Sequence, residues 1–131
     1  NGSMKLAKEL IDAASSADCD AVKFQKRTVE AVYSREDLDR PRESPWGTTN
    51  REQKYGLEFT EEEYNEIDSY CKQKGIEWFA SAWDIDSQLF LRKYELKYNK
   101  VASAMLTDRE GALLNSCIAT VHIRWIRKMQ T

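Results

Sequence analysis

Hydrophobic positions along this chain alternate between helical spacing and the short runs typical of strands. The first helix is predicted over residues 4–14, with Ser3 as its cap. Strands are predicted at 21–25, 76–81 and 97–103, and each is followed by a helix or by a loop leading to one. Three such alternations predict an α/β fold with a parallel sheet. The apolar stripe of the first helix consists of Leu6, Ala7, Leu10, Ile11 and Ala14.

Two later helices are predicted to begin with a capping box, in which a threonine precedes a glutamate by three residues. These sequences are Thr60–Glu63 and Thr107–Glu110. The helix after Thr60 should end near Gly75, because glycine readily adopts a left-handed backbone. Between the two capping boxes, either Asp84 or Asp86 can cap a third helix. The helix after Thr60 is expected to bury Tyr64, Ile67 and Cys71. The next helix carries Leu89, Phe90 and Tyr94, and the last carries Leu113, Leu114, Cys117 and Ile118.

The polar segment 26–59 is far longer than the usual connection of about 4–6 residues, so we expect a functional or disordered loop. Three of its residues, Trp46, Arg51 and Tyr55, could line a sugar pocket or hold the loop down by apolar contact, and we favour the second interpretation. The acidic run 61–63 is better explained by the positive end of a helix than by a metal site.

Composition restricts the classes of function. A chain of 131 residues fits one domain, and its formal net charge of −2 offers no general attraction to nucleic acid or to an acidic membrane. We find no apolar run of the roughly 18 residues that a membrane span needs and no signal-peptide pattern. Three widely spaced cysteines and a single histidine, His122, favour reduced thiols in a cytoplasm and argue against a zinc site within the chain.

The most informative polar residues are Lys23 and Gln25, which lie inside an otherwise apolar predicted strand. They are two positions apart, so both project from the same face and one ligand could touch both. Lys23 could instead snorkel to solvent or form a Schiff base. Two further residues flanked by alanines, Ser81 and Ser103, could simply fill a tapered interior, and we favour packing for Ser81. The parallel sheet itself could be open or part of a (β/α)₈ barrel, although no glycine-rich nucleotide loop supports an open sheet.

With these residues in view, the chain resembles the sialic acid synthase (N-acetylneuraminate synthase) family over residues 1 to about 120. The resemblance implies a partial TIM barrel made of about strands 2–4 of a (β/α)₈ catalytic domain. Residues 121–131 form a basic tail without resemblance. The segments that carry the likeness are Asn1–Ser3, Ala21–Gln25, Trp46–Thr48, Trp78–Ala82 and Lys100–Ala104.

The resemblance also implies roles for individual residues. Lys23, Lys100 and Ser103 match positions that bind phosphoenolpyruvate in the family. Gln25 and Asn1 match positions that contact the amino sugar. Two positions depart from the pattern of some members and inherit no role: Ala82 replaces a threonine and Met105 replaces a glutamate.

The activity implied is condensation of phosphoenolpyruvate with N-acetylmannosamine or a related N-acetylated sugar to give a nine-carbon sugar acid. In the full-length family a divalent metal, manganese or magnesium, is held by two histidines on later strands, and the enzyme is a homodimer. This chain lacks those histidines, so we expect it to bind no metal alone and to be an inactive fragment. The alternative is a non-catalytic truncated barrel fragment that binds anions or associates with itself.

Overall fold

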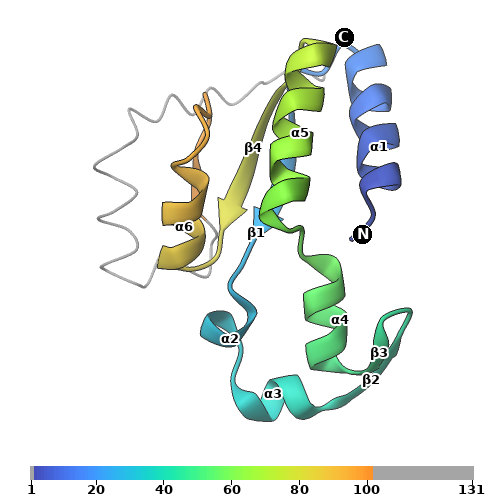
Figure 1. Ribbon diagram of the computed structural model, residues 1–131, viewed down its shortest axis with the longest axis vertical. Coiled ribbons are helices and arrows are strands. Elements are labelled where there is room, and N and C mark those ends of the chain that lie inside the picture. The colour runs from blue at the N-terminus through green and yellow to red at the C-terminus, as the bar shows by residue number, and fades with distance from the viewer. Residues whose placement is uncertain (1, 102–131) are drawn as a thin grey trace, which may run out of the picture.

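The computed structural model describes residues 2–101, and its centre is a parallel three-stranded sheet (Figure 1). The strands are β1 (Ala21–Lys26), β4 (Glu77–Ala82) and β5 (Lys100–Val101), in the order β1-β4-β5. Both neighbouring pairs are parallel. The predicted order and direction of the strands are therefore confirmed within the described residues. β5 begins three residues later than predicted, and the residues after 101 lie outside the described part.

Three helices accompany the sheet, and the predicted caps are present. Ser3 accepts a hydrogen bond from the backbone of Leu6 at the start of α1 (Met4–Ser16). A complete capping box on Thr60 begins α5 (Glu61–Lys74), which ends at Gly75 with φ at +68°. Of the two candidate caps for α6 (Ile85–Leu91), Asp84 is the one used. Tyr94 lies beyond the end of that helix, contrary to prediction, and the predicted helix 107–118 lies outside the described residues.

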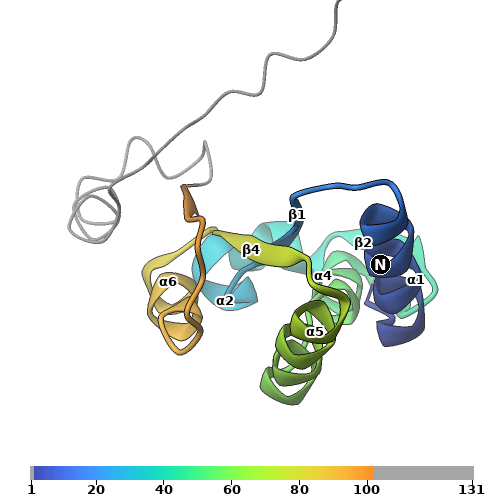
Figure 2. The ribbon, with the colours of Figure 1, turned by 90° about the horizontal axis from the view of Figure 1, so that it is seen from above.

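The hydrophobic core lies between the sheet and its helices. Figure 2 shows α5 and α6 on the same face of β4. From β4, alternate side chains point into this layer, where they meet the predicted buried residues of α5. Tyr64 is fully buried, and its ring contacts those of Phe59, Trp78, Phe90 and Tyr94. The opposite face of the sheet is therefore the one left for polar side chains. Among residues 2–101 no helix is long and apolar enough to span a bilayer.

The apolar stripe of α1 is only partly buried. Ala7 and Ile11 belong to the core, but Leu6 is 41% exposed and Leu10 is 63% exposed. Within the described residues β1 pairs only with β4, so no strand lies beside the other edge of β1 to cover these two leucines. The stripe was predicted correctly as part of a helix, and its two outer leucines remain exposed on that helix.

Residues 26–59 were expected to be a functional or disordered loop, but regular elements fill this segment. They form a lobe beyond the carboxyl ends of β1 and β4 (Figure 1). In chain order the elements are α2 (Val29–Val32), α3 (Arg35–Asp39), β2 (Pro41–Ser44), β3 (Gly47–Thr49) and α4 (Asn50–Leu57), and β2 and β3 form an antiparallel hairpin.

Contacts of the three residues singled out in this segment hold the lobe together. A Cβ atom at Gly56 would lie 2.1 Å from the Trp46 ring, so the indole packs directly on this glycine. Arg51 forms ion pairs with Glu30 and Asp39, and the Tyr55 hydroxyl donates to Glu30. The three residues hold the segment down, as expected, but two of them do so through polar contacts rather than through the apolar contact predicted.

Candidate functional site

The polar residues of β1 lie on the sheet face opposite α5 and α6. On β1, Val22 and Phe24 pack against the core, so Lys23 and Gln25 project the other way. The register pairs Lys23 with Phe79 and Gln25 with Ser81, and it pairs Ser81 in turn with Lys100. Side chains of paired residues in a parallel sheet share a face. Gln25, Ser81 and Lys100 therefore form one row across the three strands, with Lys23 one step before it.

Two cations meet in this part of the sheet. Partial desolvation, and then the nearby charge of Lys100, lowers the pKa of Lys23 from its usual value. Lys23 is still well exposed, so its ammonium group can reach a ligand. Two ammonium groups that repel each other in the free protein are stabilised when an anion lies between them. The arrangement is thus suited to binding a small phosphate or carboxylate.

Of the five predicted site residues, the structure brings three to this face: Lys23, Gln25 and Lys100. Asn1 and Ser103 lie outside the described residues. Ser81, which was not among the five predicted site residues, lies on the same face as these three, although the sequence favoured a packing role for it. Its position between Gln25 and Lys100 depends on strand register. The sequence held one signal for this position. Ser81 lies two residues after Phe79, as Gln25 lies two residues after Lys23, so each pair shares one face of its strand.

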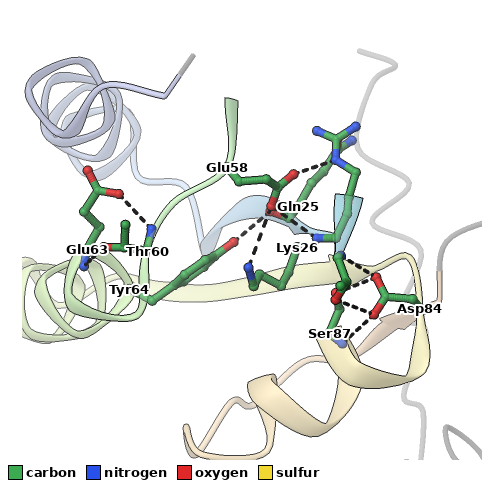
Figure 3. A network of polar contacts seen from close by, with 10 residues as sticks. Gln25, Lys26, Glu58, Thr60, Glu63, Tyr64, Asp84 and Ser87 are labelled. Atoms are coloured by element: carbon green, nitrogen blue, oxygen red, sulfur yellow. Dashed lines mark hydrogen bonds and ion pairs between the residues drawn. The ribbon is translucent and has the colours of Figure 1, made fainter. Parts of the chain in front are cut away.

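Glu58 supports the carboxyl end of β1 (Figure 3). Its carboxylate accepts hydrogen bonds from the backbone N–H and the Nε of Arg27, at 3.2 and 2.6 Å, and lies 3.9 Å from Lys26 Nζ. Burial alone would lower the pKa of Arg27, but the hydrogen bonds to Glu58 and Tyr33 and the charge of Glu58 raise it overall. The arginine therefore stays charged, and its bonds fix the chain where β1 ends.

The buried Tyr64 ties helix α5 to the same strand. Its hydroxyl donates to the Gln25 carbonyl at 2.7 Å, as the dashed lines in Figure 3 show. Burial, and then the charge of Glu58, raises the pKa of Tyr64 far above its usual range, so the hydroxyl remains a donor. The backbone of the residue that carries the Gln25 side chain is thereby held from the core side.

Asp84 joins the ends of β1 and β4. Its two carboxylate oxygens accept four hydrogen bonds of 2.7–3.0 Å, from the backbone and side chain of Thr28 and from the backbone and side chain of Ser87 (Figure 3). Thr28 follows β1, and Ser87 lies in the first turn of α6. One side chain therefore caps a helix and fixes the two strand ends relative to each other.

A cleft of about 340 Å³ opens beside Lys23 and Gln25, at the edge of β1 that has no strand partner among residues 2–101. Its polar wall contains Lys23, Gln25 and Arg27, and its apolar wall contains the exposed Leu6 and Leu10 of α1. The sequence did not predict this cleft. No group of three or more metal-ligating side chains converges anywhere in residues 2–101.

Comparison with known proteins matches residues 10–122 to the model of the NeuB family. The chain is 36% identical over 104 residues to the N-acetylneuraminate-9-phosphate synthases of Drosophila melanogaster and Mus musculus, covering 78% of this chain and 28% and 29% of those enzymes. It is 32% identical over 117 residues to the N,N'-diacetyllegionaminic acid synthase of Legionella pneumophila, covering 82% of this chain and 31% of that one. The chain thus spans less than a third of the length of these relatives.

A solved structure shows the same fold. The N-acetylneuraminic acid synthetase of Leptospira borgpetersenii, determined in complex with citrate, superposes with a TM-score of 0.63. The likeness covers 79% of this chain and 33% of that one, at 23% sequence identity. At this level of identity the superposition shows the arrangement of the elements and carries no residue roles.

Proposed function

This chain belongs to the NeuB family, and on that premise we propose that it supplies part of the substrate site of a sialic acid synthase-type enzyme. In this proposal the site binds phosphoenolpyruvate and an N-acetylated amino sugar such as N-acetylmannosamine. The enzyme joins them into a nine-carbon sugar acid.

The observation that carries the proposal is the approach of Lys23 and Lys100 from β1 and β5 on the polar face of the sheet. Phosphoenolpyruvate carries a phosphate and a carboxylate, which ammonium groups bind as point charges. In the proposal Lys23, Lys100 and Ser103 hold this anion. Gln25, beside them, and Asn1 contact the amino sugar, because an amide can both donate to and accept from hydroxyl and acetamido groups.

The reaction forms a bond between C3 of phosphoenolpyruvate and the aldehyde carbon of the open-chain sugar. Water adds at C2, phosphate leaves and a ketone remains. These residues contribute binding and orientation, because two cations near the phosphate stabilise the charge that accumulates as it departs. The family metal needs ligands that residues 2–101 do not bring together, so no step is assigned to a metal held by them.

We further propose that the three parallel strands are consecutive strands of a (β/α)₈ barrel. The polar row lies toward the carboxyl ends of β1 and β4, which is where barrel enzymes place their chemistry. Three strands cannot close a barrel of about eight. We therefore expect the 131-residue chain to bind phosphoenolpyruvate without condensing it.

Isothermal titration of the 131-residue chain with phosphoenolpyruvate tests the binding site. We expect Lys23→Met to raise the dissociation constant about tenfold or more, because a charge-assisted contact is lost while the aliphatic stem is kept. The control is Lys5→Met on the exposed side of α1, which should stay within about twofold. Equal affinities for the two variants would contradict the assignment of Lys23.

A phosphate-release assay with phosphoenolpyruvate, N-acetylmannosamine and manganese tests the incomplete barrel. No release above the buffer rate is expected from the purified chain. Turnover by this chain would show that its own residues build a complete site, and it would overturn the partial-barrel proposal.

One observation favours a second candidate, a non-catalytic fragment that associates with itself. The edge of β1 has no strand partner among residues 2–101, and Leu6 and Leu10 are exposed beside it. Light scattering separates the candidates. Concentration-dependent dimers without phosphoenolpyruvate binding would support the fragment, whereas binding that requires Lys23 supports the synthase site.

A further inference from the structure

Among residues 2–101, Ser81 differs from the other buried serine, Ser87 of α6, in having no partner for its hydroxyl group. The residue is 3% exposed, and its Oγ makes no hydrogen bond within the part of the chain that the structure describes. By contrast, the equally buried Ser87 donates its hydroxyl to Asp84 at 2.7 Å. A buried polar group without a partner destabilises a fold, and alanine would fill the same space without that cost. Packing alone therefore does not explain a serine at position 81.

The register places this hydroxyl between the polar Gln25 and the charged Lys100 of the site. Ser81 pairs with Gln25 on one side and with Lys100 on the other, so all three side chains share the polar face. On the opposite face the flanking Ala80 and Ala82 are buried in the core. The register thus places Ser81 beside residues of the lysine site, with a hydroxyl that has no hydrogen-bond partner among residues 2–101.

We propose that the Ser81 hydroxyl is a ligand of the anion that Lys23 and Lys100 bind, donating a hydrogen bond to a phosphate or carboxylate oxygen. The inference rests on the proposed function, because it takes the lysine pair as the anion site. It adds a residue that neither the sequence pattern nor the resemblance assigned to the substrate. A serine hydroxyl supplies direction here, whereas the two ammonium groups supply charge.

A ligand role and a structural role for Ser81 predict opposite effects of Ser81→Ala. If the hydroxyl serves only the anion, its removal should leave the urea midpoint of the free chain unchanged or higher, since an unpaired buried group is lost. The same variant should raise the dissociation constant for phosphoenolpyruvate about tenfold or more. Inorganic phosphate, as a second probe, shows which group is contacted: weakened phosphate binding assigns the hydroxyl to the phosphoryl oxygens, and unchanged phosphate binding assigns it to the carboxylate.

The matched control is Ser87→Ala, which deletes the same hydroxyl from an equally buried serine that has a partner. This variant should lower the urea midpoint, because a buried hydroxyl that has a partner is lost. If Ser81→Ala lowers the midpoint as much as Ser87→Ala, or leaves the affinity for phosphoenolpyruvate within twofold, the hydroxyl is not a ligand.

Lys23→Met separates failure of this inference from failure of the proposed function. If Lys23→Met weakens binding and Ser81→Ala does not, only the inference about Ser81 is overturned. If the unmodified chain binds neither phosphoenolpyruvate nor phosphate, both are overturned.

Discussion

Replacing Asp84 by asparagine tests whether one carboxylate holds the ends of β1 and β4 together. Each of its oxygens accepts one hydrogen bond from a backbone N–H and one from a hydroxyl. Oδ1 accepts from the Ser87 N–H and the Thr28 hydroxyl, and Oδ2 accepts from the Thr28 N–H and the Ser87 hydroxyl. An asparagine retains one of these oxygens and puts an NH₂ group in place of the other. Whichever way the amide is turned, one backbone N–H faces another donor.

The magnitude follows from the bonds that are lost. A buried donor left without an acceptor costs about 1–3 kcal/mol, and the hydrogen bonds that remain lose their charge assistance. These contributions come from one side chain and are not additive. We therefore expect Asp84→Asn to lower the free energy of unfolding by about 2–3 kcal/mol. Asp86→Asn is the control, because Asp86 is exposed in the first turn of the same helix and should cost no more than about 0.5–1 kcal/mol.

Urea unfolding of the 131-residue chain, followed by circular dichroism at constant pH, measures both values. The two variants remove the same charge from the same helix, so their difference isolates the bonds to Thr28 and Ser87. A difference below about 0.5 kcal/mol would show that the carboxylate does not fix the two strand ends, and the account of the site's support would be wrong.

Two further predictions concern titratable groups. In an NMR titration the pKa of Lys23 should lie below its ordinary value of 10.5, and it should rise in the Lys100→Met variant. The affinity for phosphoenolpyruvate should fall as pH rises through that lowered pKa, because binding needs the ammonium form of Lys23. An unshifted pKa of Lys23 in both proteins would refute the lysine pair. Burial and then the charge of Asp68 raise the pKa of the Cys71 thiol to about 11. Iodoacetamide added to the folded chain at pH 8 should therefore label the exposed Cys19 and spare Cys71, as peptide mapping will show. Equal labelling of the two cysteines would contradict the buried core.

The elements that could be predicted from sequence are those whose signals are local. The capping box at Thr60 and the glycine at 75 fix both ends of α5 through contacts a few residues long, and both were found. The lobe at 26–59 escaped prediction because its helices are too short to show a hydrophobic period. Its contacts, such as the Trp46 ring on Gly56, join residues that no periodic pattern relates.

The parts of the site that escaped prediction depend on long-range contacts. Asp84 and Asp86 are equivalent helix caps in the sequence, and only the approach of Thr28 distinguishes them. Likewise, the alanines on both sides of Ser81 suggest a packing residue. That its hydroxyl has no partner within residues 2–101, and that it lies between Gln25 and Lys100, follow only from the fold. The lysine and glutamine of β1 were identifiable because polar residues inside an apolar strand stand out locally.

The separation of β1 from β4 along the chain has a consequence for synthesis on the ribosome. Fifty residues, 27–76, lie between the paired strands, and at about 5–20 residues per second their translation takes roughly 3–10 seconds. During this interval β1 exists without the partner that pairs with it in the fold, and an unpaired apolar strand is a template for aggregation. Lys23 and Gln25 make one face of that strand polar until β4 has been synthesised. The side chains proposed to hold the substrate in the finished protein would therefore also protect the nascent one.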